Sequence, residues 1–453
     1  MTSALPRPLV SGPVHVPADA DYAPELAAFN TDIQHTPDIV VGVSSADDVV
    51  RSVAFAREQG LSVSVQGTGH GASAAVTRGL LVSTRRLDAV RVDPGTRNAT
   101  IGAGARWGAV VAAAAEHGLA PVPGGSGTVG VAGYLLGGGL GPFARSHGFS
   151  SDYVLGFTVV TGAGDLVEAT ADANPDLFWA MRGGKYGLGV VTEVRLRLVE
   201  LDPLYAGSLF FAEDDIEAAL HAWADWTPSA DPAVTTSAAV IRFPPLDVVP
   251  EPLRGRRLLS VRFAYPGPAE DGKRLAAPLR AAAPVYLDVL APMPAAQMAR
   301  IHNDPEQPGP SWTTGAMLTH LDKQSVDVLL SQVGAGTDAP FVAAEVRHVG
   351  SPATSRDVPE GSAVGGRGVA YTLGLISLPV PDLFRAATPA AAAALVGELG
   401  PWRAEETTVN FTGVRRPGEA APRSWSPEVA ARLAEVRRRY DPAGVLAGPP
   451  AAH

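Results

Sequence analysis

Short β-branched runs and amphipathic stretches follow one another through the first two hundred residues. The run 39–43 precedes a segment in which Ser45 and Asp48 have a spacing close to that of a helix capping box, and Gly60 is placed to end the helix. A second apolar run follows at 61–65. A strand, a helix and a second strand in this order predict a β-α-β unit with parallel strands.

The same region contains further strand and helix signals. Asn174 followed by Pro175 is a typical helix start, and the alternation of apolar and charged residues over 190–198 is typical of a half-buried strand. We also expect strands at 80–83, 90–92 and 99–103, a helix over 106–117, and a hairpin formed by 157–161 and 166–169.

After about Asp202 the pattern changes to longer strands separated by proline-rich loops. Alternating apolar and polar residues predict strands at 237–243, 258–265, 341–349 and 368–377. Such alternation indicates an antiparallel sheet with one covered face. A last strand is expected at 407–412, and Ser426 with Pro427 opens a C-terminal helix.

Composition narrows the possible functions. The 453 residues carry a net charge of −10, which argues against non-specific nucleic-acid binding, and the absence of cysteine excludes disulfides, thiolate metal sites and a cysteine nucleophile. The amino terminus has no charged region followed by an apolar run, so we expect no signal peptide and a cytoplasmic location. The uncharged stretch 118–144 could span a bilayer in length, but nine of the eighteen residues in 124–141 are glycine, which disfavours a membrane helix.

The loop after the run 61–65 is the first stretch that suggests chemistry. It reads Gln66-Gly67-Thr68-Gly69-His70-Gly71. Glycines at this density let backbone N–H groups face one way and bind an anion, although a plain glycine turn is the alternative. No amphipathic helix follows, so the loop is no dinucleotide fingerprint of the Rossmann type. His70 between two glycines points to a cofactor contact, the alternative being an ordinary polar histidine.

The second stretch is the glycine-rich segment 124–141. Its apolar spacers, such as Val129, Val131 and Leu135, are unusual for a flexible linker, and the composition suits backbone packed against a flat ligand. The sequence contains no HExxH, no Walker loop and no paired histidine–carboxylate spacing, so we expect no metal site.

Together these stretches resemble the FAD-linked oxidases of the vanillyl-alcohol oxidase superfamily, specifically the berberine-bridge-enzyme-like group. The resemblance extends from about Tyr22 to Leu198 and weakly to the C terminus. The similar segments, in order, are Ala28-Phe29-Asn30, Gly69-His70, Thr128-Val129-Gly130 with 137–141, 174–184 and Gly189-Val190-Val191-Thr192.

The resemblance implies an α+β fold in which two α/β subdomains form a PCMH-type FAD-binding domain (1–202). An antiparallel-sheet substrate domain (203–400) and a C-terminal segment returning to the FAD domain (401–453) would follow. His70 would bond covalently to the flavin 8α-methyl, the loop 67–71 would bind the pyrophosphate, and Val190 and Val191 would lie by the adenosine. The cofactor-contacting residues implied are Gly67, Thr68, Gly69, His70, Gly71, Ser126, Thr128, Val129, Gly130, Gly133, Gly137, Gly138, Gly139, Gly141, Val190, Val191 and Asn410.

The chain departs from the family pattern at residues that matter chemically. Ser126 stands where many relatives have a cysteine that makes a second flavin bond, so we expect a single covalent link through His70. Thr408 and Phe411 stand where tyrosines near the catalytic base are usual. The base must then come from elsewhere, and Tyr371 on the strand 368–377, or His348 on the strand 341–349, is the candidate; simple packing of Tyr371 is the alternative.

The resemblance implies an FAD-dependent oxidase that takes a hydride from an alcohol- or amine-type carbon of a small molecule of secondary metabolism, with oxygen as electron acceptor. The alternative is a redox-neutral cyclase or isomerase that keeps FAD on the same scaffold. No nucleic-acid or membrane partner is expected, and the sequence leaves the oligomeric state open.

Overall fold

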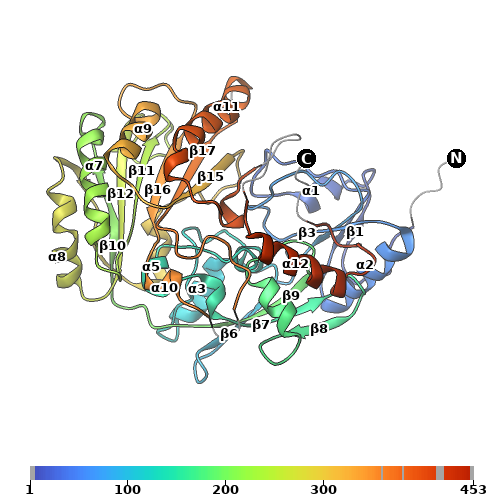
Figure 1. Ribbon diagram of the computed structural model, residues 1–453. Coiled ribbons are helices and arrows are strands. Elements are labelled where there is room, and N and C mark those ends of the chain that lie inside the picture. The colour runs from blue at the N-terminus through green and yellow to red at the C-terminus, as the bar shows by residue number, and fades with distance from the viewer. Residues whose placement is uncertain (1–5, 359–360, 380–381, 415–422, 449–453) are drawn as a thin grey trace.

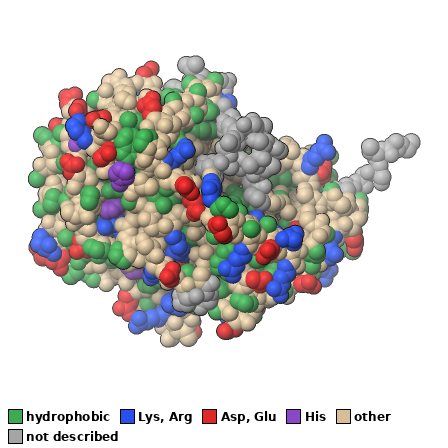
Figure 2. All heavy atoms as spheres, in the orientation of Figure 1, with side chains coloured by type: hydrophobic (Ala, Val, Ile, Leu, Met, Phe, Trp, Pro, Cys, Tyr) green, Lys and Arg blue, Asp and Glu red, His purple; other side chains and the backbone are tan. Residues whose placement is uncertain are grey.

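Three sheets and the helices around them make up the fold (Figure 1). The computed structural model describes residues 6–358, 361–379, 382–414 and 423–448. In the part of the chain so described, no helix is both long and apolar enough to cross a membrane. Figure 2 shows acidic and basic side chains interspersed over the visible face.

The first sheet is the predicted α/β unit, with one difference in strand order. Its order is β1-β2-β4-β3, and β4 pairs in parallel with both β2 and β3, so the two expected strands are parallel but not adjacent. The Ser45 hydroxyl accepts a hydrogen bond from the Asp48 amide, as the capping spacing predicts, and Gly60 ends α2 with a left-handed φ of 65°. The elements are β1 (Val14–His15), α1 (Tyr22–Leu26), β2 (Ile39–Gly42), α2 (Ala46–Gln59), β3 (Val63–Gln66) and β4 (Leu80–Ser83).

The second sheet has five strands in the order β5-β6-β9-β7-β8, including the predicted hairpin β7–β8. The C-terminal helix α12 (Pro427–Tyr440) packs Leu433, Val436 and Tyr440 into the core of this sheet. The elements are β5 (Val90–Asp93), β6 (Asn98–Gly102), α3 (Trp107–Ala115), α4 (Val131–Leu136), α5 (Ala144–His147), the 3-10 turn η1 (Ser150–Tyr153), β7 (Val154–Val160), β8 (Leu166–Ala169), α6 (Pro175–Met181) and β9 (Val190–Arg197).

The third sheet has eight antiparallel strands, which confirms the antiparallel sheet predicted after about Asp202. Helices cover one of its faces, and Figure 1 shows α7 and α8 on its outer side, away from the first two sheets. Trp223 of α7, Leu329 of α9 and Leu395 of α11 share a buried core with Val261 and Leu373 of the strands. The strands are β10 (Leu204–Phe211), β11 (Thr235–Arg242), β12 (Arg257–Pro266), β13 (Val285–Asp288), β14 (Ala291–Met293), β15 (Trp312–Leu318), β16 (Ala343–His348) and β17 (Tyr371–Ser377), and the helices are α7 (Ile216–Trp226), α8 (Ala269–Arg280), α9 (Lys323–Val333), α10 (Pro352–Ser355) and α11 (Asp382–Glu398). The short 3-10 turns of this half are η2 (Glu213–Asp215), η3 (Thr227–Ser229), η4 (Ala295–Ile301), η5 (Gly400–Trp402) and η6 (Val409–Phe411).

The fold class inferred from the sequence is confirmed, but the predicted strand at 407–412 is wrong. The segment contains the 3-10 turn η6 instead. The Thr408 hydroxyl donates to the Gly365 carbonyl, and the Thr412 hydroxyl donates to the Val409 carbonyl. Threonine hydroxyls that bond nearby backbone compete with a strand ladder, and here the local bonds close a turn.

Candidate functional site

The loop that carries His70 is held by the segment Ala28-Phe29-Asn30. The Phe29 amide donates to the Thr68 carbonyl over 2.9 Å, and the imidazole of His70 stacks on the Phe29 ring with centroids 3.6 Å apart. Gly69 has a φ of 74°, and a Cβ at this residue would lie 2.4 Å from that of Ala28. Only glycine therefore allows the loop to approach this segment so closely.

The start of the glycine-rich segment lies directly against the histidine loop. The Gly130 amide donates to the Thr68 hydroxyl over 3.2 Å. The Thr128 hydroxyl lies 3.0 Å from Nε2 of His70 and 2.9 Å from the Ser126 hydroxyl. The structure thus brings together two stretches that are more than fifty residues apart in sequence.

His70 is a neutral imidazole at neutral pH. Burial, followed by the positive charge of Arg106, lowers the pKa of His70 to about 4. Since the pKa falls below the ordinary 6.5, the ring keeps a free nitrogen lone pair down to about pH 4.

The second half of the glycine-rich segment meets the C-terminal part of the chain. A Cβ at Gly137 would lie 2.0 Å from Oδ1 of Asn410, so the Asn410 amide packs directly on this glycine. The Asn410 amide donates to the Tyr134 carbonyl over 2.9 Å and accepts a hydrogen bond from the Lys185 ammonium over 2.8 Å. Lys185 is a side chain that the sequence did not single out for this site.

The remaining predicted cofactor residues lie partly at the site and partly in the cores. Gly138 and Gly139 have left-handed φ angles of 93° and 79°, which glycine adopts without strain. Val190 packs with the core of the first sheet and Val191 with that of the second. The structure therefore shows packing roles for the two valines, and their contact with adenosine stays a prediction.

Open space beside the backbone and a buried polar atom without a partner suit a large flat ligand. No atom lies within 4 Å of the position that a Cβ of Gly133 would take, and beside Gly71 the atom that does is Nζ of Lys185, at 3.7 Å. The indole nitrogen of Trp107 is buried without a hydrogen-bond partner. Open backbone, an unmatched donor and the neutral imidazole of His70 fit a flavin.

The face of the third sheet that carries no helices is polar at its centre. Ser237 of β11 lies opposite Arg262 of β12 and Arg347 of β16. The Glu345 carboxylate accepts hydrogen bonds from the Ser237 hydroxyl at 2.8 Å, from the Arg262 guanidinium at 2.6 Å and from Nε of Arg347 at 2.7 Å. We call Ser237, Arg262, Glu345 and Arg347 the polar face.

Glu345 is a permanent anion within the polar face. Burial would raise the pKa of this carboxyl, but the guanidinium groups of Arg347 and Arg262 outweigh burial and hold the pKa well below its usual range. Its lone pairs are occupied by three donors, so Glu345 is a charge partner and not a free base.

His302 connects the polar face with the glycine-rich segment. It follows η4, and its ring lies so close to Gly125 that a Cβ there would be 2.8 Å from the imidazole Cγ. Nε2 of His302 lies 3.8 Å from a Glu345 oxygen. Burial, together with Arg347 and Arg262, holds the pKa of His302 well below 6.5. No local pattern pointed to His302, because it lies in a proline-rich loop without periodicity.

Tyr371 and His348, the predicted candidates for the base, lie on the helix-covered face of the same sheet. Their rings stack with centroids 4.9 Å apart, and the Tyr371 hydroxyl lies 2.6 Å from the hydroxyl of Thr227. Burial raises the pKa of Tyr371, and burial with Arg145 lowers the pKa of His348 to about 3. The structure does not bring either residue together with His70, because odd and even positions of a strand face opposite sides.

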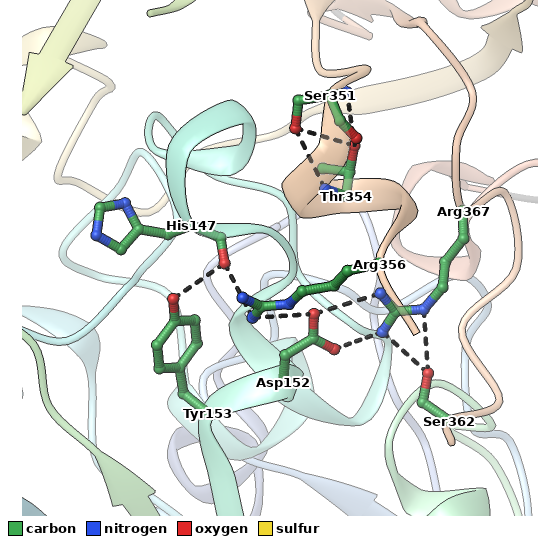
Figure 3. Close-up of polar contacts among 8 residues, drawn as sticks. All are labelled: His147, Asp152, Tyr153, Ser351, Thr354, Arg356, Ser362 and Arg367. Atoms are coloured by element: carbon green, nitrogen blue, oxygen red, sulfur yellow. Dashed lines mark hydrogen bonds and ion pairs between the residues drawn. The ribbon is translucent and has the colours of Figure 1, made fainter. Parts of the chain in front are cut away.

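Charged contacts attach the loops at one end of the third sheet to α5 and η1, which follow the glycine-rich segment (Figure 3). Asp152 of η1, whose side chain is fully buried, pairs with Arg367 and, at 3.5 Å, with Arg356. Arg356 also donates to the carbonyl of His147 over 3.2 Å. Arg145 of α5 donates to the carbonyls of Gly350, Asp231, Val234 and Ala230 beside the sheet. These contacts fix the orientation of the sheet over the glycine-rich segment.

The described residues include no group of three or more His, Asp or Glu side chains placed to hold a metal ion.

Comparisons with known proteins show an FAD binding domain in the part of the chain that contains these residues. A family model described as "FAD binding domain" matches residues 37–170, which include His70 and the whole of 124–141. The chain is 35% identical over 223 residues to (R)-6-hydroxynicotine oxidase of Paenarthrobacter nicotinovorans, covering 48% of this chain and 49% of that protein. The chain thus spans about half the length of the curated relatives it matches.

Solved structures share the fold over nearly the entire chain. Physcomitrella patens BBE-like 1 has a TM-score of 0.82 at 18% identity and covers 98% of this chain and 97% of its own. Glucooligosaccharide oxidase from Acremonium strictum, whose structure is described as having a 6-S-cysteinyl, 8α-N1-histidyl FAD, has a TM-score of 0.80 at 19% identity, with 96% of each chain covered.

Proposed function

We propose that this chain, which carries an FAD binding domain and has the fold of the berberine-bridge-like flavin oxidases, is an FAD-dependent oxidoreductase acting on a small molecule. The resemblance inferred from the sequence is confirmed for the FAD domain and for the fold. Bound FAD would supply the two-electron chemistry by accepting a hydride from an alcohol- or amine-type carbon, and oxygen would then reoxidise it.

The observation that carries this proposal is the contact between the histidine loop and residues 126–130. Two glycine-rich segments meet around one neutral imidazole, and a Cβ at Gly133 of α4, the helix that follows Gly130, would meet open space. A neutral imidazole in a glycine loop can approach a ligand without steric conflict and can act as a nucleophile.

We also propose that FAD is linked once, through His70. The Ser126 hydroxyl bonds that of Thr128, the partner of His70. The resemblance inferred from the sequence puts at Ser126 the cysteine that makes a second link in many relatives. A hydroxyl is far less acidic than a thiol and is a much weaker nucleophile. The chain has no cysteine that could replace it.

Purification followed by acid denaturation tests cofactor and linkage together. The protein is expected to be yellow, with one FAD that stays in the acid pellet, and peptide mapping is expected to find the adduct at His70. His70→Ala should release FAD into the supernatant, whereas His117→Ala, an exposed histidine, should not. Colourless folded protein that takes up no added FAD would contradict the proposal; wild-type protein that releases all its FAD would contradict the covalent link alone.

A redox-neutral cyclase or isomerase is the second candidate, because Thr408 and Phe411 provide no titratable group where tyrosines are usual. Anaerobic mixing with substrate separates the two functions. An oxidoreductase bleaches the flavin absorbance in one turnover, and a redox-neutral enzyme forms product without bleaching.

A further inference from the structure

The polar face and His302 are not used by the proposed function as stated above, which leaves open how the substrate loses its proton. We propose that His302, supported by Glu345, accepts the proton of a neutral hydroxyl group of the substrate, and that the site selects alcohols over ammonium ions. This inference rests on the proposed function for the acceptor of the hydride.

The position of His302 carries the first step of the argument. Its side chain is only 5% exposed, its ring packs on Gly125, and neither ring nitrogen has a hydrogen-bond partner. Leaving two buried nitrogens unmatched is costly, so a missing donor is expected at this place. A substrate hydroxyl held between the sheet and the glycine-rich segment would supply that donor.

Glu345 and His302 have different roles. Three donors bond the Glu345 carboxylate, and the neighbouring arginines hold its pKa well below its usual range. Glu345 is therefore too weak a base to accept the substrate proton. His302 is neutral and free, with Nε2 3.8 Å from Glu345. The Glu345 carboxylate favours the imidazolium that forms when a proton arrives, against burial and the two arginines, which oppose it.

The charges around His302 carry the third step. Arg262 from β12 and Glu345 and Arg347 from β16 act on its ring, and Asp304, two residues away, acts on the two arginines. The small cavity beside the ring is lined by residues including Thr235, Ser237, Arg262 and Arg347, and none of its lining residues is acidic. In this cavity an ammonium ion would face two guanidinium groups and no carboxylate in the lining, whereas developing negative charge on a hydroxyl oxygen would be stabilised.

The reaction balances for an alcohol. The O–H bond breaks, and its proton goes to a ring nitrogen of His302. The C–H bond of the same carbon breaks, and its hydrogen leaves as a hydride that reduces bound FAD. A C=O bond forms. The imidazolium then returns its proton to solvent. The substrate is oxidised by two electrons, and the chain itself is unchanged.

Rapid anaerobic mixing tests the role of His302. The probes are D-glucose, benzyl alcohol and 2-phenylethanol, and the alcohol that bleaches the wild-type flavin fastest is used for the variants. His302→Gln is expected to slow bleaching about 100-fold or more, which is the usual contribution of a general base. His117→Gln, an exposed histidine, is the matched control and should bleach at the wild-type rate.

The pH profile separates a base from a structural residue. The wild-type bleaching rate should stay level from neutral pH to below pH 6 and fall in stronger acid, since His302 takes up a proton only below its ordinary pKa. Arg262→Gln removes a positive charge that opposes protonation, so its acid limb should move to higher pH. An unchanged acid limb in Arg262→Gln, or a normal rate in His302→Gln, overturns the assignment, and a larger loss in His348→Gln than in His302→Gln does the same.

Ligand binding tests the charge preference without turnover. Benzyl alcohol and benzylammonium are matched in shape, and each is titrated anaerobically while the visible spectrum of the bound FAD is followed at pH 7. Benzylammonium should bind at least about tenfold more weakly, because like charges oppose it. Equal binding, or no binding by either probe, overturns the preference for alcohols.

The outcomes also separate this inference from the proposed function. If benzylamine bleaches the flavin and no alcohol does, the inference is wrong and the oxidoreductase function stands. If dithionite bleaches the flavin and no probe alcohol or amine does, the binding titration alone decides the charge preference. The proposed function fails if the folded protein takes up no FAD.

Discussion

The two faces of the eight-stranded sheet have opposite chemistry although the same strands build them. On the helix-covered face Val346 and Leu373 lie in an apolar core, and Tyr371 and His348 bond or stack within it. On the other face Glu345 and Arg347 form a buried charged network beside the glycine-rich segment. One residue step along β16 separates the two environments.

Burial by itself does not show whether a histidine is reactive. His348 and His302 are both buried histidines with pKa values below the ordinary one. His348 is packed against a tyrosine within a core, and His302 lies beside a charged network with both nitrogens unmatched. Position relative to the cofactor domain, and not burial, distinguishes a candidate reactive group from a packed one.

The largest expected effect is the loss of the carboxylate on the polar face. Glu345→Gln leaves Arg262 and Arg347 buried without their counter-charge, and breaking a buried ion pair in this way costs about 3–5 kcal/mol of unfolding free energy. Urea denaturation of the FAD-loaded protein measures it. Glu193→Gln, which breaks an exposed pair with Arg91, is the matched control and should cost no more than about 1 kcal/mol. Equal losses in the two variants would show that the polar face is not a tightly coupled network.

The next effect concerns acid stability and the helix-covered face. The folded-state pKa of His348 is lowered from 6.5 to about 3, so between these values the unfolded chain binds more protons and stability falls as the pH falls. This one group should account for a loss of about 2 kcal/mol between pH 6.5 and pH 5. In His348→Gln the urea midpoint should fall less steeply with pH over this range than in the wild type. The comparison is of slopes, so it holds even if the variant is less stable at pH 7. His117→Gln should keep the wild-type slope, and a wild-type slope in His348→Gln would contradict the prediction.

The smallest effect is expected from Tyr371→Phe, which sharpens the assignment of the two faces. The change removes one hydroxyl, whose partner is the Thr227 hydroxyl, and should cost about 1 kcal/mol. The rate of anaerobic flavin bleaching should stay at the wild-type value, because the hydroxyl lies on the helix-covered face. A large drop in that rate at unchanged stability would restore Tyr371 as the candidate base and contradict the comparison of the faces.

Much of the site followed from local sequence. Glycines at 67–71 and 124–141 indicated backbone that approaches its neighbours closely. The structure shows Gly69 in a contact with Ala28 that no larger residue could make, and the Asn410 amide packed on Gly137. Ser45 and Gly60 marked the ends of α2 correctly. These signals are readable because they depend on the conformational limits of one or two residues.

Other features depended on contacts between distant segments. β4 lies between β2 and β3, and the segment around Thr408 forms a turn where a strand was expected. The sequence pointed to Tyr371 and His348, and it missed His302, Lys185 and the polar face. His302 and Glu345 are 43 positions apart in the chain and meet because the end of η4 and β16 line one cavity with Gly141.

The sequence by itself determined the strands of the first two sheets except β1, the alternation of β11, β12, β16 and β17 in the third sheet, and the glycine loops. These features follow from the period of a strand and from the conformational freedom of single residues. Alternation divides β16 into two sets of side chains but gives neither set a direction. Only the tertiary structure decided that α7, α9 and α11 cover the side with His348 and Tyr371 and that the side with Glu345 and Arg347 faces the glycine-rich segment. That choice depends on which apolar surfaces from distant parts of the chain become buried together, and no local pattern contains it.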